Sequence, residues 1–193
     1  MAAARNRGVF QMDDEKKEKD EGLDWDYLME VPERKEEVGD TYQTPGFGLA
    51  AQLFACMAKA VIDKLGREEG EALLKEGIEL FGGERGRHIA ERVEAMGKPP
   101  TLKNWLIYTD IDSGNFGATP KVEDGNLILD VGSCSFYEAA AEWGMEEYAC
   151  IYCKYADYAI LGGYNPDIKL ILEPRKPGGG ECSFRYIVKE GNK

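Results

Sequence analysis

Residues 118–131 read Ala-Thr-Pro-Lys-Val-Glu-Asp-Gly-Asn-Leu-Ile-Leu-Asp-Val, and this stretch decides the fold class. Two short apolar runs flank Asp124-Gly125, a pair that favours the positive φ angles of a tight hairpin turn. A second pair of strands is expected at 168–172 and 182–188, joined by the glycine-rich turn 177–180. Strands that are joined by hairpins pair in antiparallel fashion, so we predict an antiparallel sheet.

Apolar residues at helical spacing precede the first hairpin and return between the two hairpins. The expected helices are, in chain order, 49–65, 67–96, a short one at 101–108, then 135–143 and 146–161. Gly82, Gly83 and Gly86 each cost about 1 kcal/mol in a helix, so they indicate a bend or the close approach of another backbone. Gly162-Gly163 is expected to end the last helix.

Apart from the short helix, the element order is α-α-β-β-α-α-β-β. This order predicts an α+β domain whose antiparallel sheet is covered by helices. We place that single domain at 46–193. Residues 1–45 form a charged N-terminal extension, because the first 40 residues alone hold 7 basic and 13 acidic side chains. Such a composition predicts a solvated segment that is flexible or docked through a few apolar residues, among them Trp25 and Val31.

The composition excludes several classes of function. The chain of 193 residues carries a net charge of −12, so a broad basic surface for nucleic acid is not expected. No apolar run approaches the ~20 residues of a membrane span, so no membrane association is expected. Five cysteines are an odd number at spacings unlike a disulfide scaffold, which favours reduced thiols in the cytoplasm. The single histidine, His88, excludes a histidine-rich metal site.

Three side chains with chemical potential share one face of the helix expected at 146–161. Cys150, Cys153 and Asp157 are spaced i, i+3, i+7, and Cys134 and Cys182 lie in flanking elements. Three interpretations stay open: thiols packed in the core, a metal site, or a nucleophile next to a carboxylate. A metal would use Cys134, Cys150, Cys153 and Cys182, but Cys-x-x-Cys in mid-helix is unusual for zinc. No cofactor is therefore expected.

Other candidate residues have an ordinary structural explanation beside the functional one. Arg85 and Arg87 could bind a substrate carboxylate and His88 could transfer protons, or all three could lie on a solvated helix face with ion pairs. Tyr155 could supply a hydroxyl to a pocket or pack in the core. Asn165 could contact a ligand or only satisfy the backbone of a turn.

The order and spacing of several motifs resemble one family, the L-2-amino-thiazoline-4-carboxylic acid hydrolase-like proteins. The resemblance runs from about residue 53 to 186, and it is carried by the segments 82–90, 97–99, 134–136, 152–157, 163–166 and 180–186. The family often has Cys-Pro where this chain has Cys134-Ser135, and Gly-Asp where this chain has Gly180-Glu181.

The resemblance implies a hydrolase that opens a thiazoline ring, converting 2-amino-thiazoline-4-carboxylate to a carbamoyl-cysteine. That reaction needs a nucleophile at the carbon between nitrogen and sulfur, a proton donor, and a cation for the carboxylate. The nucleophile would be Cys153, Cys182 or Cys134, and Asp157 the base or orienting group. The carboxylate would meet Arg87 or Arg185.

Strand alternation bears on the choice of cation, since it puts Arg185 on the face of the sheet opposite Cys182. Arg185 is therefore the weaker candidate of the two.

The element order is also similar to the vinyl-reductase-like and vesicle-tethering superfamily of ligand-binding domains. That similarity supports a second hypothesis, a sensor or carrier that binds a small molecule or metal without converting it. A third hypothesis is an interaction protein that acts through its acidic extension. The expected partner is a small molecule, and assembly of identical copies is compatible with the sequence.

Overall fold

The computed structural model describes residues 29–41 and 43–187. The chain divides into two units, 1–43 and 44–193. In the first unit, Val31–Val38 forms helix α1, which has no buried residue. The sequence analysis did not anticipate this helix. The expected docking of Trp25 lies outside the described residues.

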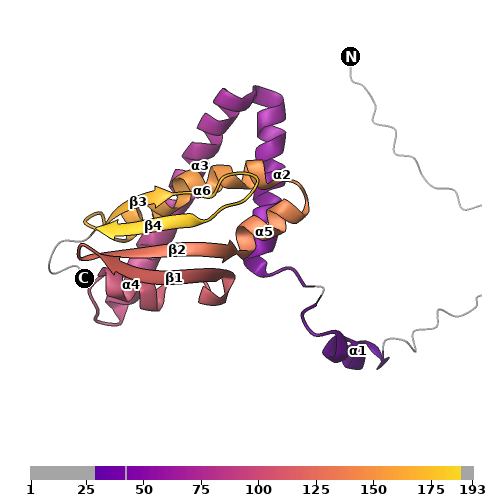
Figure 1. Ribbon diagram of the computed structural model, residues 1–193, viewed down its shortest axis with the longest axis horizontal. Coiled ribbons are helices and arrows are strands. Elements are labelled where there is room, and N and C mark those ends of the chain that lie inside the picture. Colours follow the sequence, from indigo (N-terminus) through magenta and orange to yellow (C-terminus); the bar gives the residue numbers. More distant parts are fainter. Residues whose placement is uncertain (1–28, 42, 188–193) are drawn as a thin grey trace, which may run out of the picture. The chain divides into compact units, whose positions relative to one another are not determined.

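The second unit is an α+β domain with a four-stranded antiparallel sheet, as predicted (Figure 1). Its elements are α2 (Gly46–Leu65), α3 (Arg67–Ala95), α4 (Leu102–Tyr108), the 3-10 turn η2 (Ser113–Asn115), β1 (Phe116–Glu123), β2 (Asn126–Cys134), α5 (Ser135–Glu142), α6 (Glu146–Tyr164), β3 (Lys169–Glu173) and β4 (Cys182–Ile187). The strand order is β1-β2-β4-β3, so the two hairpins join through β2 and β4.

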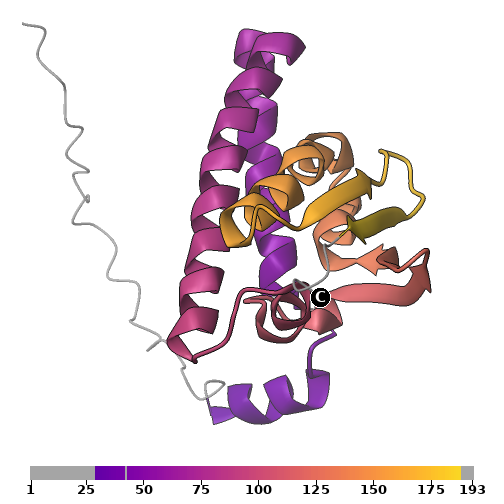
Figure 2. The ribbon, with the colours of Figure 1, turned by 90° about the vertical axis from the view of Figure 1, so that its left-hand side faces the viewer.

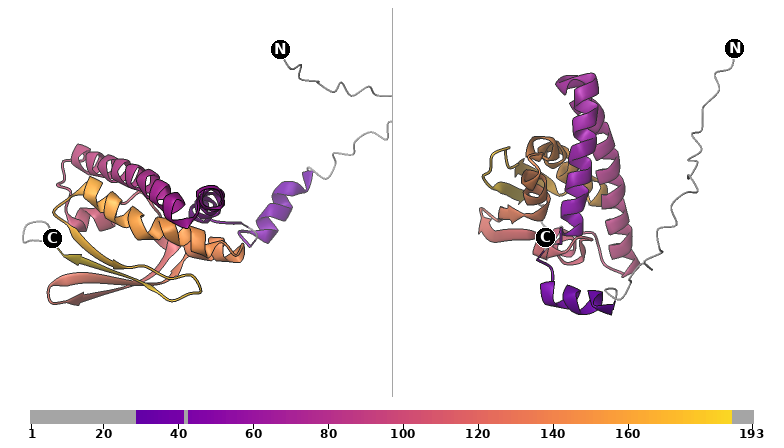
Figure 3. Two further views of the ribbon diagram at one scale, coloured as in Figure 1. Left: turned by 90° about the horizontal axis from the view of Figure 1, so that it is seen from above. Right: turned by 90° about the vertical axis from the view of Figure 1, so that its right-hand side faces the viewer.

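The helices lie on one face of the sheet. Figure 3 shows α6 between the sheet and α3, and Figure 2 shows α2 and α3 side by side as an antiparallel pair. The face of the sheet that meets the helices carries apolar residues at alternate positions, namely Leu127, Leu129, Leu170, Leu172, Phe184 and Tyr186. All of these except Leu172 join a core built mainly from α3 and α6.

Glycines let α3 and α6 approach each other closely. A Cβ on Gly86 would overlap the carbonyl oxygen of Ile160 and lie 2.7 Å from the backbone nitrogen of Tyr164. A Cβ on Gly163 would lie 3.0 Å from the Cα of Gly83. The predicted close approach of another backbone is therefore confirmed. The prediction that Gly162-Gly163 ends the helix is wrong, because this pair lies inside α6 at its contact with α3.

The buried face of α2 is not the face expected from its large apolar residues. Leu49, Leu53 and Met57 are more than half exposed, and Cys56 is exposed with them. The buried residues are small or polar: Gly48, Ala51, Gln52, Ala55 and Ala58. Small side chains allow a close contact with α5, since a Cβ on Gly48 would lie 2.8 Å from the Cβ of Ala139.

The apolar character of α2 has a second aspect. By length and composition, α2 alone among the helices of the described residues qualifies as a candidate membrane span, although the core helix of a soluble protein passes the same test. The sequence analysis expected no run of this kind. The small-residue face of α2 packs in an apolar cluster with Phe136 and Ala140 of α5, and 28% of its apolar window is buried.

Candidate active site

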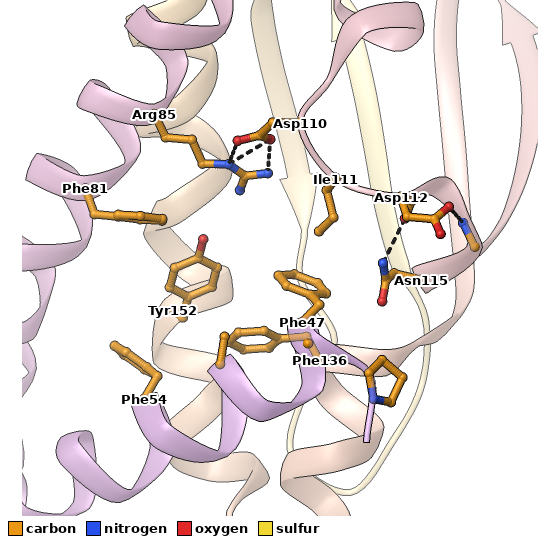
Figure 4. A pocket seen from close by; sticks show the side chains of 14 residues that line it. Phe47, Phe54, Phe81, Arg85, Asp110, Ile111, Asp112, Asn115, Phe136 and Tyr152 are labelled. Atoms are coloured by element: carbon orange, nitrogen blue, oxygen red, sulfur yellow. Dashed lines mark hydrogen bonds and ion pairs between the residues drawn. The ribbon is translucent and has the colours of Figure 1, made fainter. Parts of the chain in front are cut away.

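A cavity of about 850 Å³ opens between α2, α3, α5, α6 and the segment that follows α4. Aromatic rings form much of its wall (Figure 4). They are Phe47, Phe54, Phe81, Phe136 and Tyr152. The ring of Phe136 lies 4.9 Å from that of Phe47 and 4.9 Å from that of Tyr152, centroid to centroid. Such a wall suits a flat or apolar part of a ligand.

An ion pair between Arg85 and Asp110 supplies much of the polar part of the same wall. The Nε of Arg85 donates to both carboxylate oxygens of Asp110 at 3.0 Å, and its Nη2 donates at 2.6 Å. Burial opposes ionisation of Asp110, but Arg85 outweighs burial and the pKa of Asp110 is lowered. The hydroxyl of Tyr152 points toward Arg85 (Figure 4). Since its charge is already balanced, Arg85 is a weak site for a second carboxylate.

Cys134 and Cys153, two of the cysteines predicted from the sequence, pack in the apolar cluster that contains Phe136 and Tyr152 of this wall. Burial raises the pKa of Cys153 well above its ordinary value, and the neighbouring Asp157, Cys150, Cys182 and Cys134 raise it further. Asp157 and the other three thiols are thus within electrostatic range of Cys153. The four thiols and the carboxylate come from β2, α6 and β4. None of them is among the described residues that line the cavity.

Asp157 is the most unusual group in this region. Burial raises its pKa from the ordinary 3.8 to about 6, and only the charge of Arg85 opposes the shift. No side chain or backbone N–H of the described residues donates a hydrogen bond to its carboxylate. The residue still keeps part of its surface accessible. Its charge also raises the pKa of Tyr186 on β4. An enclosed carboxylate without a partner is a common feature of catalytic sites.

The thiols are held in the neutral form. Burial raises the pKa of Cys150 to about 11 and raises those of Cys134 and Cys182 as well. Opposing influences on Cys182 are the backbone N–H of Arg175, which donates to the sulfur at 3.2 Å, and the charge of that arginine. A thiol in this cluster therefore needs a base at the moment of attack.

The raised pKa of Asp157 predicts a pH dependence of stability. Its unfolded pKa is near 3.8 and its folded pKa about 6. The penalty for burying the ionised form grows as the pH rises from about 4 to about 7. Between pH 4.5 and 7.5 the wild type should therefore lose about 2 kcal/mol of unfolding free energy relative to Asp157→Asn. Urea unfolding of both proteins at these two pH values measures this difference. An equal difference at the two pH values would contradict the shift.

Among the residues that the structure describes, no group of three or more His, Cys, Asp or Glu side chains is arranged to hold a metal ion. The conditional metal site at Cys134, Cys150, Cys153 and Cys182 has no support in this geometry.

Two candidate residues on α3 lie on an exposed helix face. Arg87 pairs with Glu84 and Glu91, and about half of its side chain is exposed. His88 is 60% exposed, and its Nδ1 lies 3.3 Å from a carboxylate oxygen of Glu91. Both belong to an ordinary network of ion pairs, and neither lines the cavity.

Three further candidates make structural contacts. The hydroxyl of Tyr155 donates to Glu71 of α3 at 2.8 Å. The side-chain amide of Asn165 donates to the carbonyl of Pro100 at 2.8 Å and so ties the end of α6 to the start of α4. Arg185 lies on the face of the sheet away from the helices and pairs with Glu123, in agreement with the strand alternation.

The sequence analysis missed three parts of this region. It did not select Asp110, the partner of Arg85, and it did not select the phenylalanines of the cavity. For the phenylalanines a signal was available, because Phe47 and Phe54 are seven residues apart and therefore share a helix face. It also missed Arg175, in the loop between β3 and β4, which is only 7% exposed. A lone arginine in a polar loop gives no signal of burial.

Comparison with known proteins agrees with the resemblance drawn from the motifs. The family model described as L-2-amino-thiazoline-4-carboxylic acid hydrolase matches residues 46–186, which is well over half of the chain. No curated protein matches the sequence. The matched segment contains the whole aromatic cavity apart from Pro45, and it contains the buried thiols and Asp157. The chain therefore belongs to the L-2-amino-thiazoline-4-carboxylic acid hydrolase family.

Proposed function

We propose that this protein hydrolyses a small thiazoline-type ring that bears a carboxylate, with Cys153 and Asp157 acting at the reacting carbon. The observation that carries the proposal is the desolvated carboxylate of Asp157, which has no hydrogen-bond donor among the described residues and lies one helical turn from Cys153. A base with a pKa of about 6 is ionised at neutral pH and accepts a proton more readily than an ordinary carboxylate. The family name supports a hydrolase.

The chemistry follows from these two groups. Asp157 takes the proton of the Cys153 thiol as the sulfur adds to the ring carbon between nitrogen and sulfur. The ring carbon–sulfur bond breaks, and the departing sulfur takes the proton from Asp157. Asp157 then takes a proton from a water whose oxygen adds to the same carbon. The Cys153 sulfur leaves with the proton from Asp157, and the proton of the added hydroxyl passes to the former ring nitrogen as the carbonyl forms. The net change is the addition of one water and the release of an open-chain carbamoyl-cysteine.

The test uses 2-amino-thiazoline-4-carboxylate in excess over the purified protein. Mass spectrometry should show a product heavier by one water, and a thiol reagent should detect its free sulfhydryl. Cys153→Ser should lower kcat by about 10²-fold or more. Cys56→Ser is the matched control, because Cys56 is exposed on α2 and its removal should leave kcat unchanged. Equal activity of Cys153→Ser and wild type would exclude Cys153 as the nucleophile.

A second candidate function is ligand binding without turnover. It is supported by the large aromatic cavity, none of whose described lining residues is a cysteine, and by the neutral state of the thiols. This candidate predicts that the same thiazoline stays intact in the presence of the protein. It also predicts that native mass spectrometry of freshly purified protein finds a bound small molecule.

A further inference from the structure

Arg175 is a buried cation that has no counter-ion among the residues that the structure describes. Its residue is 7% exposed, and its Nη2 donates to the carbonyl oxygens of Val131, at 3.3 Å, and Gly132. The guanidinium carbon lies 4.6 Å from the centre of the Tyr137 ring. The Nε is fully enclosed and has no hydrogen-bond partner among the described residues.

No carboxylate of the described residues balances the charge of Arg175. Arg34, Arg67, Arg85, Arg87 and Arg185 each have a carboxylate within 4.0 Å, and Arg175 has none among the residues that the structure describes. Carbonyl dipoles and an aromatic face compensate a buried charge only in part, because the removal of an ion from water costs several kcal/mol. A buried, uncompensated arginine is therefore a position prepared for an anion.

The surroundings of Arg175 link this position to the proposed reaction. Its backbone N–H donates to the sulfur of Cys182, and its charge reaches Cys134 and Cys150. These thiols are neutral, so they do not supply the missing negative charge. The three arginines expected from the sequence to bind a carboxylate are already paired: Arg85 with Asp110, Arg87 with two glutamates and Arg185 with Glu123. Arg175 remains.

We propose that Arg175 binds the carboxylate of the substrate, with the ring directed toward the neighbouring thiols. This inference rests on the proposed function for the identity of the ligand, a small ring with a carboxylate. It assigns to a loop residue the role that the sequence assigned to Arg87 or Arg185. The planar guanidinium offers a donor geometry that a carboxylate matches and a carboxamide does not.

The experiment compares binding of 2-amino-thiazoline-4-carboxylate with binding of its 4-carboxamide by calorimetry. Wild type should bind the carboxylate about 10- to 100-fold more tightly, the range expected for a charge-assisted hydrogen bond. Arg175→Lys and Arg175→Met should reduce this preference to about threefold or less. Lys176→Met removes an exposed charge from the same loop and should retain the full preference. A full preference in Arg175→Lys would overturn the assignment.

A second measurement is independent of whether the variants fold. The enclosed Nε–H of Arg175 should give a slowly exchanging signal in ¹⁵N NMR spectra of the wild type, identified by its loss in Arg175→Lys. Addition of the carboxylate should shift this signal, and addition of the carboxamide should not. No shift with the carboxylate at saturation would reject the assignment.

The two proposals fail separately. Selective binding without hydrolysis would keep Arg175 as the anion site and remove the hydrolase function. Hydrolysis with unchanged selectivity in the Arg175 variants would do the opposite.

Discussion

Asp157→Asn is expected to lower kcat for ring opening by about 10²- to 10⁴-fold, the usual contribution of a positioned general base. Asparagine has nearly the same shape as aspartate but cannot accept a proton, so the attack of the Cys153 thiol would lose its base. The domain should stay folded, because the change removes a desolvated carboxylate that makes no hydrogen bond with the described residues.

The pH profile gives this prediction its specificity. The kcat of the wild type should rise with pH to a plateau above about pH 6, as Asp157 becomes ionised. The residual activity of Asp157→Asn should lack that rise. Asp167→Asn is the matched control, since Asp167 is exposed in the turn after α6 and should keep full activity. More than a tenth of wild-type kcat in Asp157→Asn would remove Asp157 from the mechanism.

Gly86→Ala is expected to destabilise the domain by about 3–5 kcal/mol, at the upper end for a single added methyl group. The new Cβ would overlap the carbonyl oxygen of Ile160 and lie 2.7 Å from the nitrogen of Tyr164. Both obstacles are backbone atoms of α6, so no side-chain rotation relieves the clash. Thermal unfolding should therefore show a midpoint lower by about 10 °C or more.

Gly77→Ala serves as the control in the same helix. No atom lies within 4 Å of a Cβ at this position, so the substitution should raise stability by about 0.5–1 kcal/mol through helix propensity alone. If Gly86→Ala and Gly77→Ala have the same unfolding midpoint, the close contact between α3 and α6 does not exist in solution.

Local patterns predict the fold of this protein well. Asp124-Gly125 has positive φ at both residues and forms the predicted hairpin. Thr101 accepts a hydrogen bond from the backbone N–H of Asn104 and starts the predicted short helix. The errors occur where packing overrides local preference. Gly162-Gly163 continues a helix because α3 lies against it, and α2 buries alanines because α5 lies too close for leucines.

The candidate site is less predictable, since it depends on contacts between distant segments. Helical spacing was sufficient to group Cys153 with Asp157, because both belong to one helix. Spacing could not show that Arg85 is neutralised by Asp110, 25 residues away. It also could not reveal that a loop folds Arg175 into the interior against β2. A buried charge is recognised only when its neighbours are known.

The glycine contact between α3 and α6 also has a consequence for motion. Backbones in direct contact cannot separate without losing their packing, so the wall that carries Arg85 and Tyr152 is the rigid side of the cavity. A ligand of this cavity then enters and leaves past the opposite rim, formed by Phe47, residues 110–112, Gly114 and Asn115. Amide hydrogens on that rim should exchange with solvent faster than those of α6.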